Sequence, residues 1–146
     1  MKRWLALDLG TKRIGTAVSD PLGVTAQPLK VIPSRGKNKD LIAIMALVVE
    51  LSATQVVVGL PLNMDGTDST RTRRTRLFAK ELASRLFIPV VLVDERLTSW
   101  QAEEVLKETG AHGRDRKKNV DRVAAALILR SALDGAKLIP AMTETK

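Results

Sequence analysis

The 146-residue chain is strongly basic and contains no cysteine, and both properties narrow its chemistry. Its length and its 45% hydrophobic content suit one core, so we expect residues 1–146 to form a single domain. The lack of cysteine excludes disulfides, thiolate metal sites and cysteine nucleophiles. We find no leader-like start and no apolar run of membrane-spanning length, and therefore expect a cytoplasmic protein that does not bind membranes.

The charge balance favours an anionic partner. Lys and Arg number 24 against 16 Asp and Glu, a formal net charge of +8. Nucleic acid is the commonest partner for such a charge, although a solvated cationic surface gives the same total. The cations gather in residues 35–39, 71–76 and 114–118. Because aromatic residues make up only 3% of the chain, we expect contacts to phosphates rather than base stacking.

The first third of the chain predicts three strands. Residues 4–9 form an apolar run that ends at a Gly-Thr-Lys turn. In residues 13–20, apolar or β-branched residues alternate with small ones, which is typical of the second strand of an antiparallel hairpin. Residues 25–32 predict a third strand, and Pro28 within it indicates an edge or an irregularity.

After residue 40 helices and strands are expected to alternate. Asp40 is the expected N-cap of a helix over residues 41–51. β-branched runs predict strands within residues 55–61 and 88–95. Helices are expected over residues 70–87, 99–110 and 119–135. The tail from residue 136 shows little pattern of either kind. Strands separated by helices pair in parallel. We therefore predict an α/β domain with a mixed five-stranded sheet, antiparallel at its start and then parallel, and helices on both faces.

One carboxylate stands inside the first predicted strand. Asp8 shares a face with Trp4 and Ala6, because side chains alternate along a strand. An isolated ionised group in such a place is costly, and it would neutralise by a pKa shift unless it had a partner. Asp8 therefore either accepts hydrogen bonds from the turn at Gly10 or binds a metal ion.

Two acids end the strand predicted at residues 88–95. Asp94 and Glu95 follow its β-branched run, at the edge where α/β sheets gather their ligands. Because they point to opposite faces, either of them could be functional. The alternative is a solvated strand end in which Asp94 pairs with Arg96.

A third acid lies near the predicted start of the last helix. Asp121 follows the expected N-cap Asn119, where it could complement the helix dipole. It also forms a stripe at helical spacing with Ala124, Ala125 and Ile128, which directs it toward the sheet. Three oxygen ligands without cysteine suit Mg²⁺ or Mn²⁺, and two such ions roughly 3.5–4 Å apart would cleave a phosphodiester.

The chain resembles the YqgF/RuvX family, described as Holliday junction resolvases and as pre-16S rRNA nucleases. The resemblance is carried by the segments LALDLGTKRIGTAVSD, GLPLNMDGT, FAKELASRL, PVVLVDERLTS and DRVAAALIL. It implies a ribonuclease H-like fold and divalent-metal-dependent hydrolysis of phosphodiesters in structured RNA or branched DNA. It also implies that Asp8, Glu95 and Asp121 are the catalytic, metal-binding acids, which selects Glu95 over Asp94.

Several basic residues are candidate nucleic-acid contacts. Arg71 and Arg74 lie at helical spacing from Phe78, so we expect them to emerge at the sheet edge near the metal site. The other candidates are Lys12, Arg13, Arg96, Lys117 and Lys118. For each of them a merely solvated cation is the alternative. His112 is a candidate proton donor to the leaving oxygen, although a lone histidine in a loop is more often incidental.

Two rival functions fit parts of the sequence. One is a nucleic-acid-binding module without catalysis. The other is an ATPase of the sugar-kinase and actin-like class, which also begins with a strand followed by an Asp-Leu-Gly-Thr turn. The length argues against the ATPase, because such enzymes pair two related domains around the nucleotide. The sequence is compatible with a monomer or a homodimer.

Overall fold

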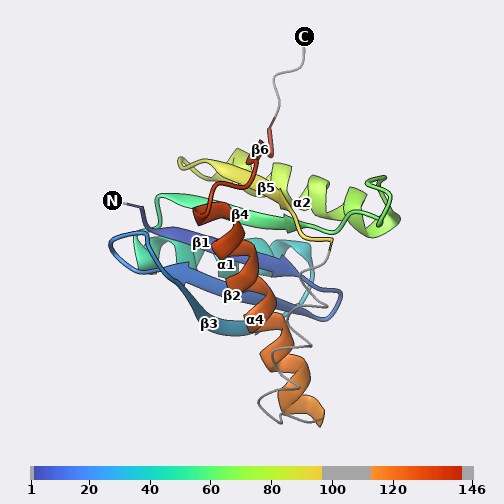
Figure 1. Ribbon diagram of the computed structural model, residues 1–146, viewed down its shortest axis with the longest axis horizontal. Helices are drawn as coiled ribbons and strands as arrows, with labels where there is room; N and C mark the ends of the chain where they lie inside the picture. Colours follow the sequence, from blue (N-terminus) through green and yellow to red (C-terminus); the bar gives the residue numbers. More distant parts are fainter. Residues whose placement is uncertain (1, 97–112, 143–146) are drawn as a thin grey trace.

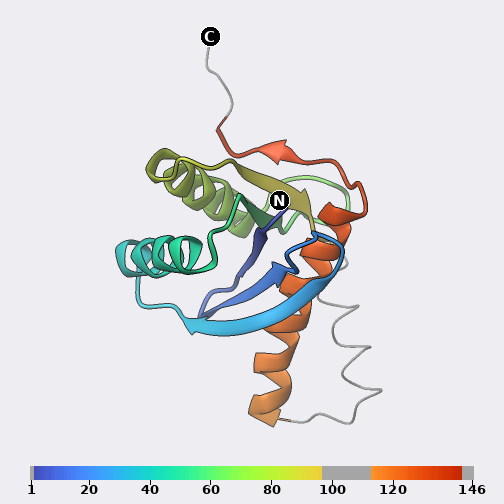
Figure 2. The same cartoon turned by 90° about the vertical axis from the view of Figure 1, so that its left-hand side faces the viewer.

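The computed structural model describes residues 2–96 and 113–142, and for residues 113–121 it describes the backbone alone. These residues form one mixed sheet with helices packed on both faces (Figures 1 and 2). The strands are β1 (Trp4–Leu9), β2 (Arg13–Ser19), β3 (Ala26–Pro33), β4 (Gln55–Leu60), β5 (Val90–Asp94) and β6 (Ile139–Pro140). The helices are α1 (Lys37–Leu51), α2 (Thr70–Arg85) and α4 (Gly113–Leu133).

The sheet has the order β3-β2-β1-β4-β5-β6. Its first three strands are antiparallel, and β1, β4 and β5 then pair in parallel, which confirms the predicted mixed pairing. The predicted count of five is one strand short. Leu92 lies opposite Ile139 where β6 adds antiparallel to β5. A strand of two residues is too short to show an alternating pattern, so the sequence does not reveal it.

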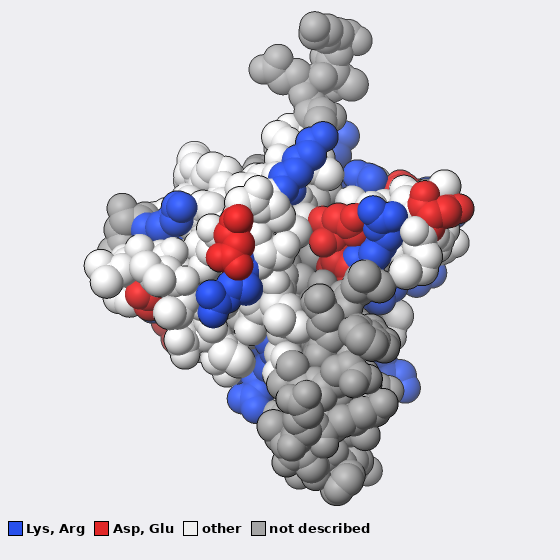
Figure 3. Space-filling view, viewed as in Figure 1, with Lys and Arg blue, Asp and Glu red and all other residues white. Residues whose placement is uncertain are grey.

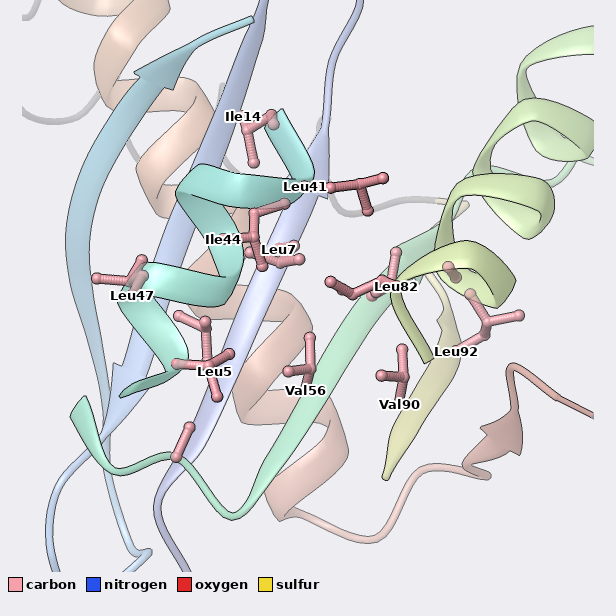
Figure 4. Close-up of a cluster of buried hydrophobic side chains, with 14 of the residues drawn as sticks. Leu5, Leu7, Ile14, Leu41, Ile44, Leu47, Val56, Leu82, Val90 and Leu92 are labelled. Atoms are coloured by element: carbon pink, nitrogen blue, oxygen red, sulfur yellow. The ribbon is translucent and has the colours of Figure 1, made fainter. Parts of the chain in front are cut away.

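Helices α1 and α2 cover one face of the sheet. Alternate residues of the central strands, such as Leu5 and Leu7 of β1, are fully buried against them. Figure 4 shows how Ile44 of α1 and Leu82 of α2 point into this layer. Burying side chains of this size stabilises the fold by roughly 1.5–3 kcal/mol each.

Helix α1 begins before the predicted N-cap. Its first residue is Lys37 and its N-cap is Gly36, so the prediction that Asp40 caps the helix is wrong. Asp40 lies within the first turn instead, where it is buried. Its carboxylate accepts a hydrogen bond from Ser34 Oγ (2.6 Å) and another from the backbone N–H of Arg35 (2.9 Å). The Asp40 carboxylate therefore holds Ser34 and Arg35, which lead into α1, against the first turn of that helix.

Helix α4 packs on the opposite face of the sheet. Its buried residues, which include Ala125 and Ile128, contact small or β-branched side chains such as Ala6 and Val57. The helix begins at Gly113, so Asn119 is not its N-cap. Asp121 stands eight residues after Gly113, beyond the first two turns. The dipole alternative for Asp121 loses its basis, because that effect is confined to the first turn.

Two predicted features lie outside the described residues, namely the helix over residues 99–110 and the loop residue His112.

Figures 1 and 2 show that the N-terminal part of α4 extends past β3 at the edge of the sheet. None of the helices in the described part of the chain combines the length and the apolar character needed to cross a bilayer.

Candidate active site

Asp8 and Glu95 lie at the carboxyl ends of strands that flank β4 on its two sides. Asp8 is the penultimate residue of β1, and Glu95 directly follows β5. Ala6 and Val93, two residues earlier in each strand, pack in the core on the α4 side. The predicted alternation is therefore confirmed, and it assigns Asp8 and Glu95 to this same side of the sheet. Both are buried, with exposed fractions of only 5% and 6%.

The environment of Glu95 disfavours its charged form. Burial is the main cause and the charge of Asp8 the second, and together they raise the pKa of Glu95 from 4.5 to about 8. The positive charge of Arg71 acts in the opposite direction, whereas Asp94 adds to the rise. Glu95 Oε1 is buried and accepts no hydrogen bond from the part of the chain that is described. Two neighbouring buried carboxylates of this kind are an arrangement that a bound cation stabilises.

The donor set fits a hard divalent cation. Mg²⁺ is typically held by one or two carboxylates and keeps several waters, and the described residues supply two buried carboxylates at this site, Asp8 and Glu95. Among the side chains that are described, no group of three acids or histidines could hold a metal. The side chain of Asp121 lies outside the described ones, as do those of Lys117 and Lys118.

The first turn of α2 is fixed by a capping box. Ser69 Oγ accepts a hydrogen bond from the backbone N–H of Thr72 (3.1 Å), and Thr72 Oγ1 accepts one from the backbone N–H of Ser69 (2.9 Å). The hydroxyl of Thr72 also donates to the carbonyl oxygen of Pro61 (2.6 Å). These bonds hold the start of α2 against the segment that leaves β4.

Arg71 in this turn reaches the acidic site. Its Nη2 donates to the carbonyl oxygen of Leu9 (3.2 Å) and lies 3.7 Å from Asp8 Oδ1. Its side chain remains 45% exposed, so it can still meet a ligand from solvent. The predicted position of Arg71 at the sheet edge is therefore observed.

A pocket of about 230 Å³ opens beside Arg71, between α2 and the turn that joins β1 to β2. Two of its lining residues are arginines, and residues of the turn line it as well. Its lining residues are Leu9, Gly10, Thr11, Ile14, Asp40, Arg71, Arg74, Thr75 and Phe78. Arg74 thus lies where the spacing from Phe78 predicts. A pocket lined by two arginines suits an anionic group such as a phosphate.

Arg96 is engaged by its own chain. Its Nε donates to Asp94 Oδ2 (2.9 Å), and its Nη1 donates to the carbonyl oxygen of Met64 (3.0 Å). Asp94 is therefore explained by an ion pair with Arg96, the alternative that the sequence left open for it. These bonds also hold the loop around Met64 at the end of β5.

The remaining described candidates lie on the turn after β1. The side chain of Lys12 is exposed, and Arg13 at the start of β2 is half-buried. On the face shown in Figure 3 the basic side chains are dispersed and acidic ones lie among them. Proximity to Asp8 and Glu95, rather than a single basic patch on this face, therefore distinguishes the candidates from one another.

Gly59 of β4 also lies at this edge, and it is not among the candidates predicted from the sequence. It lies opposite Val93 in the pairing of β4 with β5. A glycine inside a β-branched run often marks a close approach of another group, and that signal was available in QVVVGL.

The comparison with known families agrees with this geometry. The family model described as "RuvX: Holliday junction resolvase" matches residues 2–135. This chain belongs to the RuvX family.

Two curated relatives carry the name "Putative pre-16S rRNA nuclease". The relative from Anaeromyxobacter sp. is 47% identical over 133 residues, which is 91% of this chain and 97% of the relative. The relative from Koribacter versatilis is 45% identical over 132 residues, which is 90% and 86% of the two chains.

Solved structures show that this RuvX chain shares its fold with RuvC. Thermus thermophilus RuvC in complex with a Holliday junction substrate aligns with a TM-score of 0.60 at 15% identity, covering 96% of this chain and 99% of that one. A second T. thermophilus RuvC structure aligns with a TM-score of 0.51 at 16% identity, covering 94% and 99%. The ribonuclease H-like fold class predicted from the sequence is thus confirmed.

Proposed function

We propose that this RuvX chain is a divalent-metal-dependent nuclease that hydrolyses phosphodiester bonds in structured nucleic acid. The observation that carries the proposal is the pair of buried carboxylates, Asp8 and Glu95, at the carboxyl ends of β1 and β5 with Arg71 beside them. Family membership supports the same activity. We propose Asp121 of α4 as the third acid, and residues 1–146 as a single nuclease domain.

The proposed cofactor is Mg²⁺ or Mn²⁺, with two ions per site. When bound, the ions would activate the attacking water and stabilise the charge of the departing oxygen. Asp8 and Glu95 would hold them as carboxylates, so Glu95 must release the proton that its raised pKa keeps on it in the metal-free protein. Burial of both acids excludes bulk water and strengthens each electrostatic contact at the site.

Arg71 and Arg74 are the proposed phosphate contacts nearest to the acids. Both line the pocket beside the β1–β2 turn, so a phosphate held there would place an adjacent phosphodiester near Asp8. We propose that Lys12, Arg13, Lys117 and Lys118 extend this contact surface. Arg96 is the least available of the candidates, because Asp94 and the Met64 carbonyl already occupy its guanidinium.

For the substrate we propose precursor 16S rRNA first and four-way DNA junctions second. The curated relatives are named for the former and the family description names the latter. Both substrates fit binding through phosphates. A junction has two-fold symmetry, so junction cleavage would favour a homodimer that makes paired cuts, whereas a monomer would favour the RNA precursor.

A side-by-side cleavage assay tests the proposal. Precursor 16S rRNA and synthetic four-way junctions are incubated with the wild-type protein in Mg²⁺, in Mn²⁺ and in excess chelator. We expect cleavage of at least one substrate with either metal, and none with chelator. D8N should lose cleavage but keep binding. D94N is the matched control, because it also removes one acid, here one that pairs with Arg96, and it should retain both cleavage and binding.

Two results would contradict the proposal. Cleavage that persists in excess chelator would exclude the metal mechanism. Binding of both substrates without cleavage under any condition would identify a nucleic-acid-binding module without catalysis.

A further inference from the structure

We propose that Gly59 is a positioning residue for the Glu95 carboxyl group, because its lack of a side chain leaves room above its backbone for that group. The inference rests on the metal site proposed above and goes beyond it, because it assigns a role to a residue that carries no ligand atom.

The space above Gly59 is already filled by two other side chains. A Cβ atom added at Gly59 would lie 2.9 Å from Glu95 Cδ and 3.0 Å from Glu95 Oε1. It would also lie 2.4 Å from Ile128 Cδ1. The first and last of these separations are shorter than real Cβ contacts. Every residue other than glycine at position 59 would therefore displace the Glu95 carboxyl group, Ile128 or both.

Steric space, rather than backbone conformation, explains the glycine. Gly59 is not among the described residues with positive φ, so its backbone angles are open to any residue. Glycine weakens a strand, because it adds conformational entropy to the unfolded chain and packs no side chain. The flanking residues Val58 and Leu60 are fully buried. A larger residue at this position would strengthen β4 if the space above it were free.

The sheet register places this space between the two acids. Leu7 of β1 pairs with Val58 of β4, so Asp8 is next in register to Gly59. On the other side, the backbone N–H of Glu95 donates to the carbonyl oxygen of Leu60 (3.1 Å), which fixes the main chain of Glu95 at the end of β4. From that fixed point the Glu95 side chain reaches back over Gly59. The glycine thus lets the Glu95 carboxyl group, which follows β5, lie on the same side as Asp8 of β1.

Ile128 connects the same space to helix α4. Its side chain is fully buried, and its Cδ1 atom lies over Gly59. The helix can approach β4 this closely only because position 59 has no side chain. Asp121 stands seven residues, about two helical turns, before Ile128 on the same helix. The contact of Ile128 with Gly59 therefore also sets how closely α4, which carries the third proposed acid, packs on the sheet.

The test separates the two contacts with a matched pair of variants. I128V removes the Cδ1 atom, so the variant G59A/I128V retains only the conflict between the new methyl group and Glu95. We expect G59A/I128V to keep the thermal midpoint of I128V and its metal-free affinity for nucleic acid. Its affinity for Mn²⁺, measured by calorimetry without nucleic acid, should fall by about 10- to 100-fold, as when other supporting residues of metal sites are lost. Equal Mn²⁺ affinities of G59A/I128V and I128V would overturn the proposal.

A mutant cycle distinguishes positioning from a general structural effect. With Glu95 already truncated by E95A, adding G59A to I128V should cause no further loss of Mn²⁺ affinity. A further loss of the same size would overturn the assignment to Glu95. If G59A/I128V does not fold, G59A/I128A with I128A as its control gives the methyl group more room.

A crystal structure of G59A/I128V keeps this inference separate from the proposed function. We expect the Glu95 carboxyl group to have left its place above residue 59. If wild-type protein binds no Mn²⁺, the proposed metal site fails, but the crystal structure still decides the role of Gly59. An unmoved Glu95 carboxyl group in the variant overturns that role.

Discussion

The guanidinium group of Arg71 lies 3.7 Å from Asp8 Oδ1 while it donates a hydrogen bond to the carbonyl oxygen of Leu9. Arg71 belongs to a helix that covers one face of the sheet, and Asp8 lies on the side that α4 covers. The two side chains meet at the carboxyl end of β1. A phosphate bound to Arg71 would therefore lie beside the proposed metal ligands, which joins substrate binding and chemistry at one edge.

The double substitution R71A/R74A is expected to weaken binding to all nucleic-acid sequences alike. Each lost phosphate contact should also reduce the slope of log affinity against log salt by about 1. Binding titrations over a range of salt concentrations measure this slope. R73A/R76A is the matched control, because it removes two positive charges from the same helix, where Arg76 is paired with Asp68. Equal slopes for the two double variants would refute the assignment of Arg71 and Arg74.

The raised pKa of Glu95 predicts how metal-free stability depends on pH. Folded protein keeps the proton on Glu95 up to about pH 8, whereas the unfolded chain releases it near pH 4.5. Between these values the folded state binds more protons, so this group makes stability fall as pH rises. E95Q removes the contribution, and its thermal midpoint in chelator should decline less with pH than that of the wild type. Parallel curves for the two proteins would contradict the predicted pKa shift.

The capping box of α2 supports both stability and the position of Arg71. S69A removes the oxygen that accepts a hydrogen bond from the Thr72 N–H, and it should lower the free energy of unfolding by about 0.5–2 kcal/mol. Denaturant titration measures this change. S84A is the control, because Ser84 is exposed near the other end of the helix and its hydroxyl donates to the carbonyl oxygen of Glu81 in the same helix. A loss no larger in S69A than in S84A would show that the cap contributes little.

The sequence predicts that Asp8 and Glu95 lie on the same side of the sheet, because side chains alternate between the two faces along a strand. Alternation along β1 and β5 assigns Asp8 and Glu95 to one side of the sheet, and the structure packs Ala6 and Val93, two residues before them, on the α4 side. The alternation does not decide whether Asp94 is functional, because a strand end can face solvent or a ligand. The ion pair of Asp94 with Arg96 resolves that choice. Arg96 also donates to the Met64 carbonyl oxygen, a loop contact that no local pattern encodes.

Helix boundaries and close packing are less visible in the sequence. Residues 113–118 are polar and basic, so they carry no apolar stripe, yet they belong to the helical backbone of α4. For Gly59 the sequence shows only a glycine that interrupts a β-branched run, because its neighbours in space, Glu95 after β5 and Ile128 of α4, are distant in the chain. Such tertiary contacts follow only once the register of the strands and the position of the helix are known.

Direct titration of Mn²⁺ into metal-free protein tests the central claim, that Asp8, Glu95 and Asp121 hold a divalent cation. We predict saturable binding by the wild type, and a loss of affinity on the order of tenfold or more in each of D8N, E95Q and D121N. D94N should bind like the wild type, because Asp94 pairs with Arg96 instead. Absence of wild-type binding, or equal affinities in all four variants, would contradict the claim.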